Sequence, residues 1–95
     1  MKAIFKFKLL PERTQKIVFP KESRVLSAGA QGEDIFIWAM VDRETIEKEV
    51  REIVVLATGD RFHEDQAQAL ELINTVQMDS GLVFHVFEKK GYSAY

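Results

Sequence analysis

Residues 35–41 are apolar at every position, and this stretch constrains the fold more than any other part of the chain. It reads Ile-Phe-Ile-Trp-Ala-Met-Val, in which β-branched and aromatic residues dominate. Such residues favour strands, and apolar side chains on both sides of the pleat are typical of a strand covered on both faces. We therefore expect a central strand here, with the sole tryptophan, Trp38, packed in the core. If Trp38 were exposed instead, it would be a leading anchor for a partner or for a nucleotide base.

Alternating polarity predicts further strands along the chain. Residues 2–9 place apolar side chains at positions 3, 5, 7 and 9 and lysines at positions 2, 6 and 8, which is the pattern of a half-buried strand. The polar turn Asp79-Ser80-Gly81 predicts a hairpin between the last two apolar runs. The remaining strands are expected at residues 14–19, 25–30, 53–58, 72–78 and 82–88.

Helical signals are few. Residues 63–71 combine good helix formers with acidic residues near their start, where the helix dipole favours them. Asp42 is a candidate cap for a short helical turn that runs through Lys48. About seven strands and one helix predict a mainly β fold, either a small antiparallel sandwich or a partly closed barrel. The 95 residues suit a single domain, 1–95, with residues 89–95 as a flexible tail.

The composition excludes several classes of chemistry. The chain has no cysteine, so it has neither a disulfide framework nor a thiolate zinc site. Its N-terminus lacks the apolar run of a signal peptide, and no segment approaches the roughly 20 apolar residues that span a bilayer. We therefore expect a cytoplasmic protein with no membrane partner.

Charge is distributed unevenly along the chain. Residues 1–24 hold seven Lys or Arg against two acids, whereas residues 33–52 hold seven acids against three basic residues. Residues 60–79 add five acids against Arg61. These blocks could be solvated surfaces or complementary halves of a contact between copies. A net charge of -2 disfavours nucleic acid as a partner.

The side chains that could carry chemistry do not form a recognisable catalytic motif. His63, Glu64 and Asp65 follow Asp60 closely, but successive helix positions point apart, so we expect a solvated helix start and no metal. His85 lies between Phe84 and Val86 and is expected to be a partly buried, satisfied histidine. We predict no catalytic residue, no cofactor and no enzyme activity.

One ligand hypothesis remains open. Thr58-Gly59-Asp60-Arg61 offers a backbone amide and a guanidinium to an anion. An oligomer that sequesters a nucleotide signal between its subunits would use the following side chains for the phosphates and the base: Thr58, Arg61, His85 and Trp38. This reading predicts a homo-oligomer.

Several short segments, taken together and in order, resemble a family of small bacteriophage and prophage proteins to which no activity is assigned. The segments are residues 1–6, 37–42, 58–59, 73–77 and 82–88. The chain departs from that pattern at Asn74, where a glycine is expected, and in its longer polar stretch around residues 60–70. The resemblance implies a phage accessory protein that acts in an infected bacterium.

Four functions follow from these observations. The first is a non-enzymatic inhibitor or adaptor that blocks a host protein, such as a component of anti-phage defence, through a strand edge or a charged face. The second is the nucleotide-sequestering oligomer. A metal-dependent hydrolase and a structural virion component are the weaker alternatives.

Overall fold

The computed structural model of the chain describes residues 1–90, which contain seven strands and one short helix. All strand pairs are antiparallel, and the strands form two sheets that do not close into a barrel. The mainly β fold and the sandwich architecture predicted from the sequence are confirmed. The elements are β1 (Lys2–Lys8), β2 (Thr14–Pro20), β3 (Arg24–Gln31), β4 (Asp34–Asp42), β5 (Lys48–Ala57), α1 (Glu64–Ala69), β6 (Leu70–Gln77) and β7 (Val83–Lys89).

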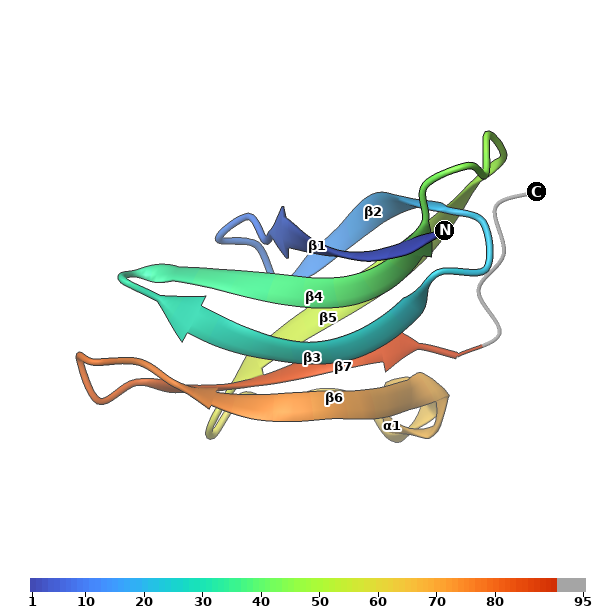
Figure 1. The fold of residues 1–95 in the computed structure, drawn as a ribbon. Helices are drawn as coiled ribbons and strands as arrows, with labels where there is room; N and C mark the ends of the chain where they lie inside the picture. Colours follow the sequence, from blue (N-terminus) through green and yellow to red (C-terminus); the bar gives the residue numbers. More distant parts are fainter. Residues whose placement is uncertain (91–95) are drawn as a thin grey trace.

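The two sheets differ in the number of their strands. The three-stranded sheet has the order β1-β4-β3, and the four-stranded sheet has the order β2-β5-β7-β6. In Figure 1, β5 passes behind β4 and β3, while β7 and β6 lie below β3 and α1 lies beside the start of β6. β4 is therefore the centre of the smaller sheet, as its apolar sequence predicted.

The core lies between the two sheets, because every second side chain of each strand points inward. β4 contributes Ile37, Ala39 and Val41 to it, and the facing sheet contributes Phe19, Ile53, Val76 and Val86. The largest fully buried side chains are Phe19, Ile37, Val41, Ile53 and Val86. Phe7 packs against Phe19 with their ring centroids 4.7 Å apart, which joins the edge strand of one sheet to the edge strand of the other.

A side chain closes the sandwich along the edge where β3 and β6 lie side by side. Asn74 on β6 accepts a hydrogen bond from the backbone N–H of Ala28 on β3 and donates another to its carbonyl oxygen, both at 2.6 Å. The amide group thus takes the place of a peptide group from a neighbouring strand. This pairing satisfies backbone groups of β3 that β4 does not reach.

Three of the predicted local structures need correction. Residues 43–47 form a turn and not a helical turn, although Asp42 does accept a hydrogen bond from the Glu44 N–H at 3.1 Å. Strand β5 already begins at Lys48, five residues before the predicted start. Helix α1 ends at Ala69, so residues 70–71 belong to β6.

The end of the chain also differs from its prediction as a tail. Lys89 ends β7, and the Lys90 N–H donates to the carbonyl oxygen of Ala69 at 2.6 Å. The rest of the predicted tail, residues 91–95, lies outside the described residues.

Candidate functional site

The side of the three-stranded sheet that faces away from the core carries apolar and basic side chains in alternation. In the register of β1 against β4, Ile4 pairs with Met40, Lys6 with Trp38 and Lys8 with Phe36, and all six point outward. Arg24 on β3 pairs with Met40 on the other side of β4. We call this surface the outer face; it comprises Lys2, Ile4, Lys6, Lys8, Arg24, Phe36, Trp38 and Met40, with Asp34 and Asp42 at the two ends of β4.

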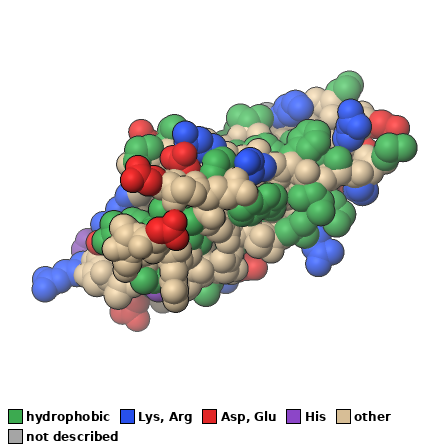
Figure 2. Space-filling view, turned by 60° about the vertical axis from the view of Figure 1, so that its left-hand side comes forward, with side chains coloured by type: hydrophobic (Ala, Val, Ile, Leu, Met, Phe, Trp, Pro, Cys, Tyr) green, Lys and Arg blue, Asp and Glu red, His purple; other side chains and the backbone are tan. Residues whose placement is uncertain are grey.

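The prediction that β4 is covered on both faces is wrong, because its outer face has no further layer of residues 1–90 over it. The shortest dimension of the molecule is 17 Å, which leaves room for two sheets packed about 10 Å apart and for nothing beyond them. Phe36, Trp38 and Met40 are accordingly only half-buried, and Ile4 is 59% exposed. In the space-filling view, hydrophobic side chains lie side by side among Lys and Arg side chains (Figure 2).

The aromatic side chains of the outer face are held in place by their neighbours. The rings of Phe36 and Trp38 lie 6.2 Å apart, and the Lys6 ammonium sits 4.6 Å above the Phe36 ring, a cation–π contact. Lys6 also donates to the Gln31 side chain at 2.9 Å. A Cβ added at Gly29 would lie only 3.2 Å from Trp38, so glycine at this position lets the indole lie against β3.

The four ligand-binding residues predicted from the sequence do not come together in one chain. Thr58 and His85 do meet, with Thr58 Oγ1 2.9 Å from His85 Nε2, and Thr75 Oγ1 lies 3.0 Å from Nδ1. Both ring nitrogens of His85 therefore have partners within the protein. Arg61 lies in the exposed loop after β5, where its carbonyl oxygen accepts a hydrogen bond from Arg13 at 2.6 Å. Trp38 is on the other sheet, so a site that uses all four would have to span two copies.

The remaining polar residues singled out in the sequence lie at the start of α1. His63 precedes this helix, and its backbone N–H donates to the side-chain oxygen of Gln66 at 3.1 Å. Glu64 and Asp65 occupy the exposed first turn. Among residues 1–90, no group of three or more His, Asp or Glu side chains is arranged to hold a metal ion.

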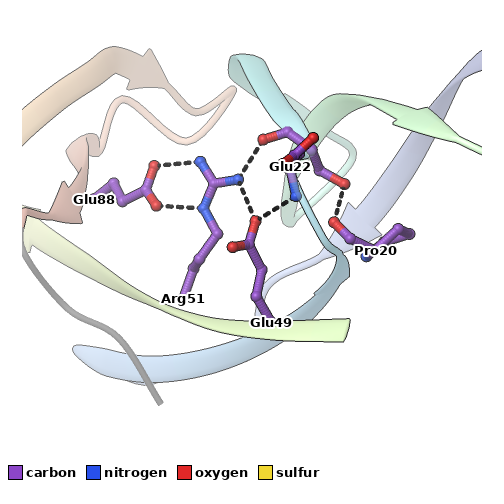
Figure 3. Close-up of polar contacts among 6 residues, drawn as sticks. Pro20, Glu22, Glu49, Arg51 and Glu88 are labelled. Atoms are coloured by element: carbon purple, nitrogen blue, oxygen red, sulfur yellow. Dashed lines mark hydrogen bonds and ion pairs between the residues drawn. The ribbon is translucent and has the colours of Figure 1, made fainter. Parts of the chain in front are cut away.

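A charged network at one end of the sandwich was missed by the sequence analysis. Figure 3 shows Arg51 of β5 between the carboxylates of Glu88 and Glu49. Arg51 makes two hydrogen bonds to Glu88, of 2.5 and 2.8 Å, and a third to the carbonyl oxygen of Ser23, of 2.5 Å. The hydrogen bonds to Glu88 raise the pKa of Arg51 above its ordinary value, so the guanidinium stays charged.

The network positions the turn between β2 and β3. Glu49 accepts a hydrogen bond from the Glu22 N–H at 3.0 Å, and Glu22 has a positive φ of 65°, which non-glycine residues seldom adopt. Ser23 donates its hydroxyl to the Pro20 carbonyl at 2.5 Å. The hydrogen bonds that Arg51 donates thus go to Glu88 and Ser23 at this end of the sandwich. We therefore assign the network a role in holding the fold together.

The sequence did contain one signal for the outer face. The lysines of residues 2–8 show which side of β1 faces solvent, and antiparallel pairing with β4 puts the even-numbered residues of β4 on that same side. The sequence of β4 alone did not reveal which of its two sides faces solvent, because its odd-numbered and even-numbered positions are equally apolar.

The fold and the outer face define the class of this protein: a two-sheet antiparallel β-sandwich with one uncovered aromatic and basic face. Residues 1–94 match the model of a family described as a domain of unknown function (DUF7352), and the chain belongs to that family. No curated protein and no solved structure matched the chain. Within residues 1–90, no helix has the length and apolar character needed to cross a membrane.

Proposed function

We propose that this protein acts by binding, as a non-enzymatic inhibitor or adaptor, and that the outer face is its contact surface. The observation that carries the proposal is the row of half-buried side chains Phe36, Trp38 and Met40 on the central strand β4, over which no further layer of residues 1–90 lies. Contiguous exposed apolar surface on a soluble protein marks an interaction site, and aromatic residues are the usual anchors of such sites.

The charges on the outer face specify the kind of partner. Lys2, Lys6, Lys8 and Arg24 flank the apolar row, and they outnumber Asp34, which pairs with Lys8, and Asp42, which lies opposite Lys2. The rim is therefore net positive, so the complementary surface is acidic at its rim and apolar at its centre. A two-fold dimer through this face would bring together two copies of the same net positive surface, which electrostatic repulsion disfavours. The proposed partner is therefore a different protein, and any self-association uses another surface.

The resemblance to phage proteins suggests that the partner is a protein of an infected bacterium. An acidic protein of the bacterial host, such as a component of its defence against phage, fits the chemistry of the outer face. Binding would block the partner sterically, by covering the surface on which it acts.

The experiment compares three forms of the protein as bait. The wild type, the double variant Phe36→Ser and Trp38→Ser, and the control Val18→Ser would each be immobilised and exposed to a bacterial lysate. Val18 is 55% exposed on the four-stranded sheet, so the control removes an apolar side chain from elsewhere on the surface.

A captured protein would then be purified and titrated against all three forms by calorimetry. We expect the wild type and the Val18 control to bind equally, the double variant to lose at least about 100-fold in affinity, and the affinity to fall as salt rises. The proposal is refuted if no purified candidate binds, or if the double variant binds as well as the wild type.

A further inference from the structure

A pocket opens between the two sheets at the end of the sandwich opposite the Arg51 network. Its volume is about 330 Å³, and its floor consists of side chains that continue the hydrophobic core. Four loops and turns meet around it: the β1–β2 loop, the β3–β4 turn, the turn after β5 and the segment after β6 (Figure 1). We call this the end pocket; its apolar lining is Leu9, Leu10, Pro11, Ile35, Val55, Ala57, Met78 and Phe84.

Hydrogen bonds hold the walls of the end pocket in place. The buried side chain of Gln15 accepts from the Leu10 N–H at 2.8 Å and donates to the carbonyls of Leu10 and Glu12, each at 3.0 Å. On the opposite wall, the Asp60 carboxylate accepts from the Ala57 N–H at 2.8 Å. Because its walls are tied in this way, the pocket is formed before any ligand enters, as is typical of small-molecule sites.

The mouth of the end pocket is acidic. Glu12, Glu33, Asp34 and Asp60 line it, against the single guanidinium of Arg13. Asp34 pairs with Lys8 at 3.5 Å. Figure 2 brings this end of the molecule forward and shows Asp and Glu side chains beside hydrophobic ones. The pocket thus joins an apolar interior to a negative entrance.

We propose that the end pocket binds a small organic cation, with its apolar body between the sheets and its charged group at the mouth. A cavity of roughly 150 Å³ accepts a benzene ring, so the end pocket has room for one ring with a short side chain. An ammonium or guanidinium group at the mouth would offset the charge of the carboxylates. The carboxylates at the mouth would repel an anionic ligand, and a neutral ligand would gain no electrostatic attraction from them.

This inference is independent of the proposed function. The end pocket opens at the end of the sandwich, whereas the outer face lies on the flat side of the three-stranded sheet. Variants of one surface leave the other unchanged, so either proposal can fail alone.

The test uses three ligands that share a 2-phenylethyl group and differ in charge: 2-phenylethylammonium, 2-phenylethanol and 3-phenylpropionate. Each is titrated at low salt into the isotope-labelled full chain, and binding is read from backbone amide shifts in two-dimensional NMR spectra. We expect the cation to shift the amides of Ile35, Ala57 and Met78, to bind about three- to tenfold more tightly than the alcohol, and to bind more tightly still than the anion.

Two variants separate charge from shape. The double variant Glu12→Gln and Glu33→Gln should remove the preference for the cation and leave the affinity for the alcohol unchanged. The control Glu44→Gln and Glu64→Gln removes two exposed carboxylates outside the pocket and should keep the preference. The proposal is overturned if the cation leaves the pocket amides unshifted, if it binds no better than the alcohol, or if both double variants behave alike.

Discussion

Replacing Asn74 with leucine should weaken the fold more than its position on an edge strand suggests. The side chain of Asn74 is the hydrogen-bonding partner of both backbone groups of Ala28, through contacts of 2.6 Å each. Ala28 is only 5% exposed, so water cannot easily replace the lost partner. Leucine has a similar size but offers neither a donor nor an acceptor.

The expected cost follows from these contacts. Two neutral hydrogen bonds contribute about 1 kcal/mol each, and an unsatisfied buried donor or acceptor costs about 1–3 kcal/mol. Asn74 itself is half-buried, so some water reaches the vacated groups and the lower part of this range applies. We expect the free energy of unfolding to fall by about 2–3 kcal/mol, which in a domain of this size lowers the melting temperature by about 10–20 °C.

Urea denaturation followed by circular dichroism measures this loss. The matched control is Gln77→Leu, which replaces an exposed amide side chain on the same strand and should change stability by less than about 0.5 kcal/mol. Asn74→Asp provides a second comparison, because it keeps the acceptor for the Ala28 N–H but loses the donor. If Asn74→Leu were as stable as the wild type, the bridge between β3 and β6 would contribute nothing and our account of this edge would be wrong.

Three further predictions concern other contacts. Arg51→Met should lower the free energy of unfolding by about 2–3 kcal/mol, and a double-mutant cycle with Glu88→Leu should give a coupling of more than about 1 kcal/mol in urea titrations; additive effects would contradict the pairing. Gly29→Ala should shift the fluorescence of Trp38 while leaving stability within about 1 kcal/mol; an unchanged spectrum would mean that the indole does not lie against β3. The hydrogen bond from the Glu44 N–H lowers the pKa of Asp42 below its ordinary 3.8. Its stabilising effect is therefore present above pH 3.8 and lost as the pH falls through the folded-state value, so Asp42→Asn should reduce the acid sensitivity of unfolding between pH 4 and pH 2, and equal sensitivity would refute this.

The strands were predictable because their signal is local. The alternation of residues 2–9 and the apolar run of residues 35–41 each identify a strand without reference to the rest of the chain. The start of β5 was missed because residues 48–52 are charged at four of five positions, which is typical of a loop. Arg51 points inward there and pairs with Glu88. Because Glu88 lies 37 positions away in the sequence, only the folded chain brings the two residues together.

The candidate site was less predictable than the fold for the same reason. Whether Trp38 faces the core or solvent depends on which side of β4 the second sheet covers, and both sides carry apolar residues. The contact of Thr58 with His85 depends on the pairing of β5 with β7, which places residues 27 positions apart side by side. Asn74 gave no sign of its role either, because its partner is the backbone of another sheet.

The distribution of side-chain sizes on β4 supports a binding role for the outer face. The inward positions of this strand hold Ile37, Ala39 and Val41, whereas the aromatic residues Phe36 and Trp38 point outward together with Met40. Nothing in the packing of the core requires large apolar residues on the solvent side, where polar ones would serve the sheet as well. They expose apolar surface that favours association, and lysines beside them limit association with a second copy. A sheet built in this way is suited to a partner that is apolar at its centre and acidic around it, and loss of binding on changing Phe36 and Trp38 is the result that this reasoning requires.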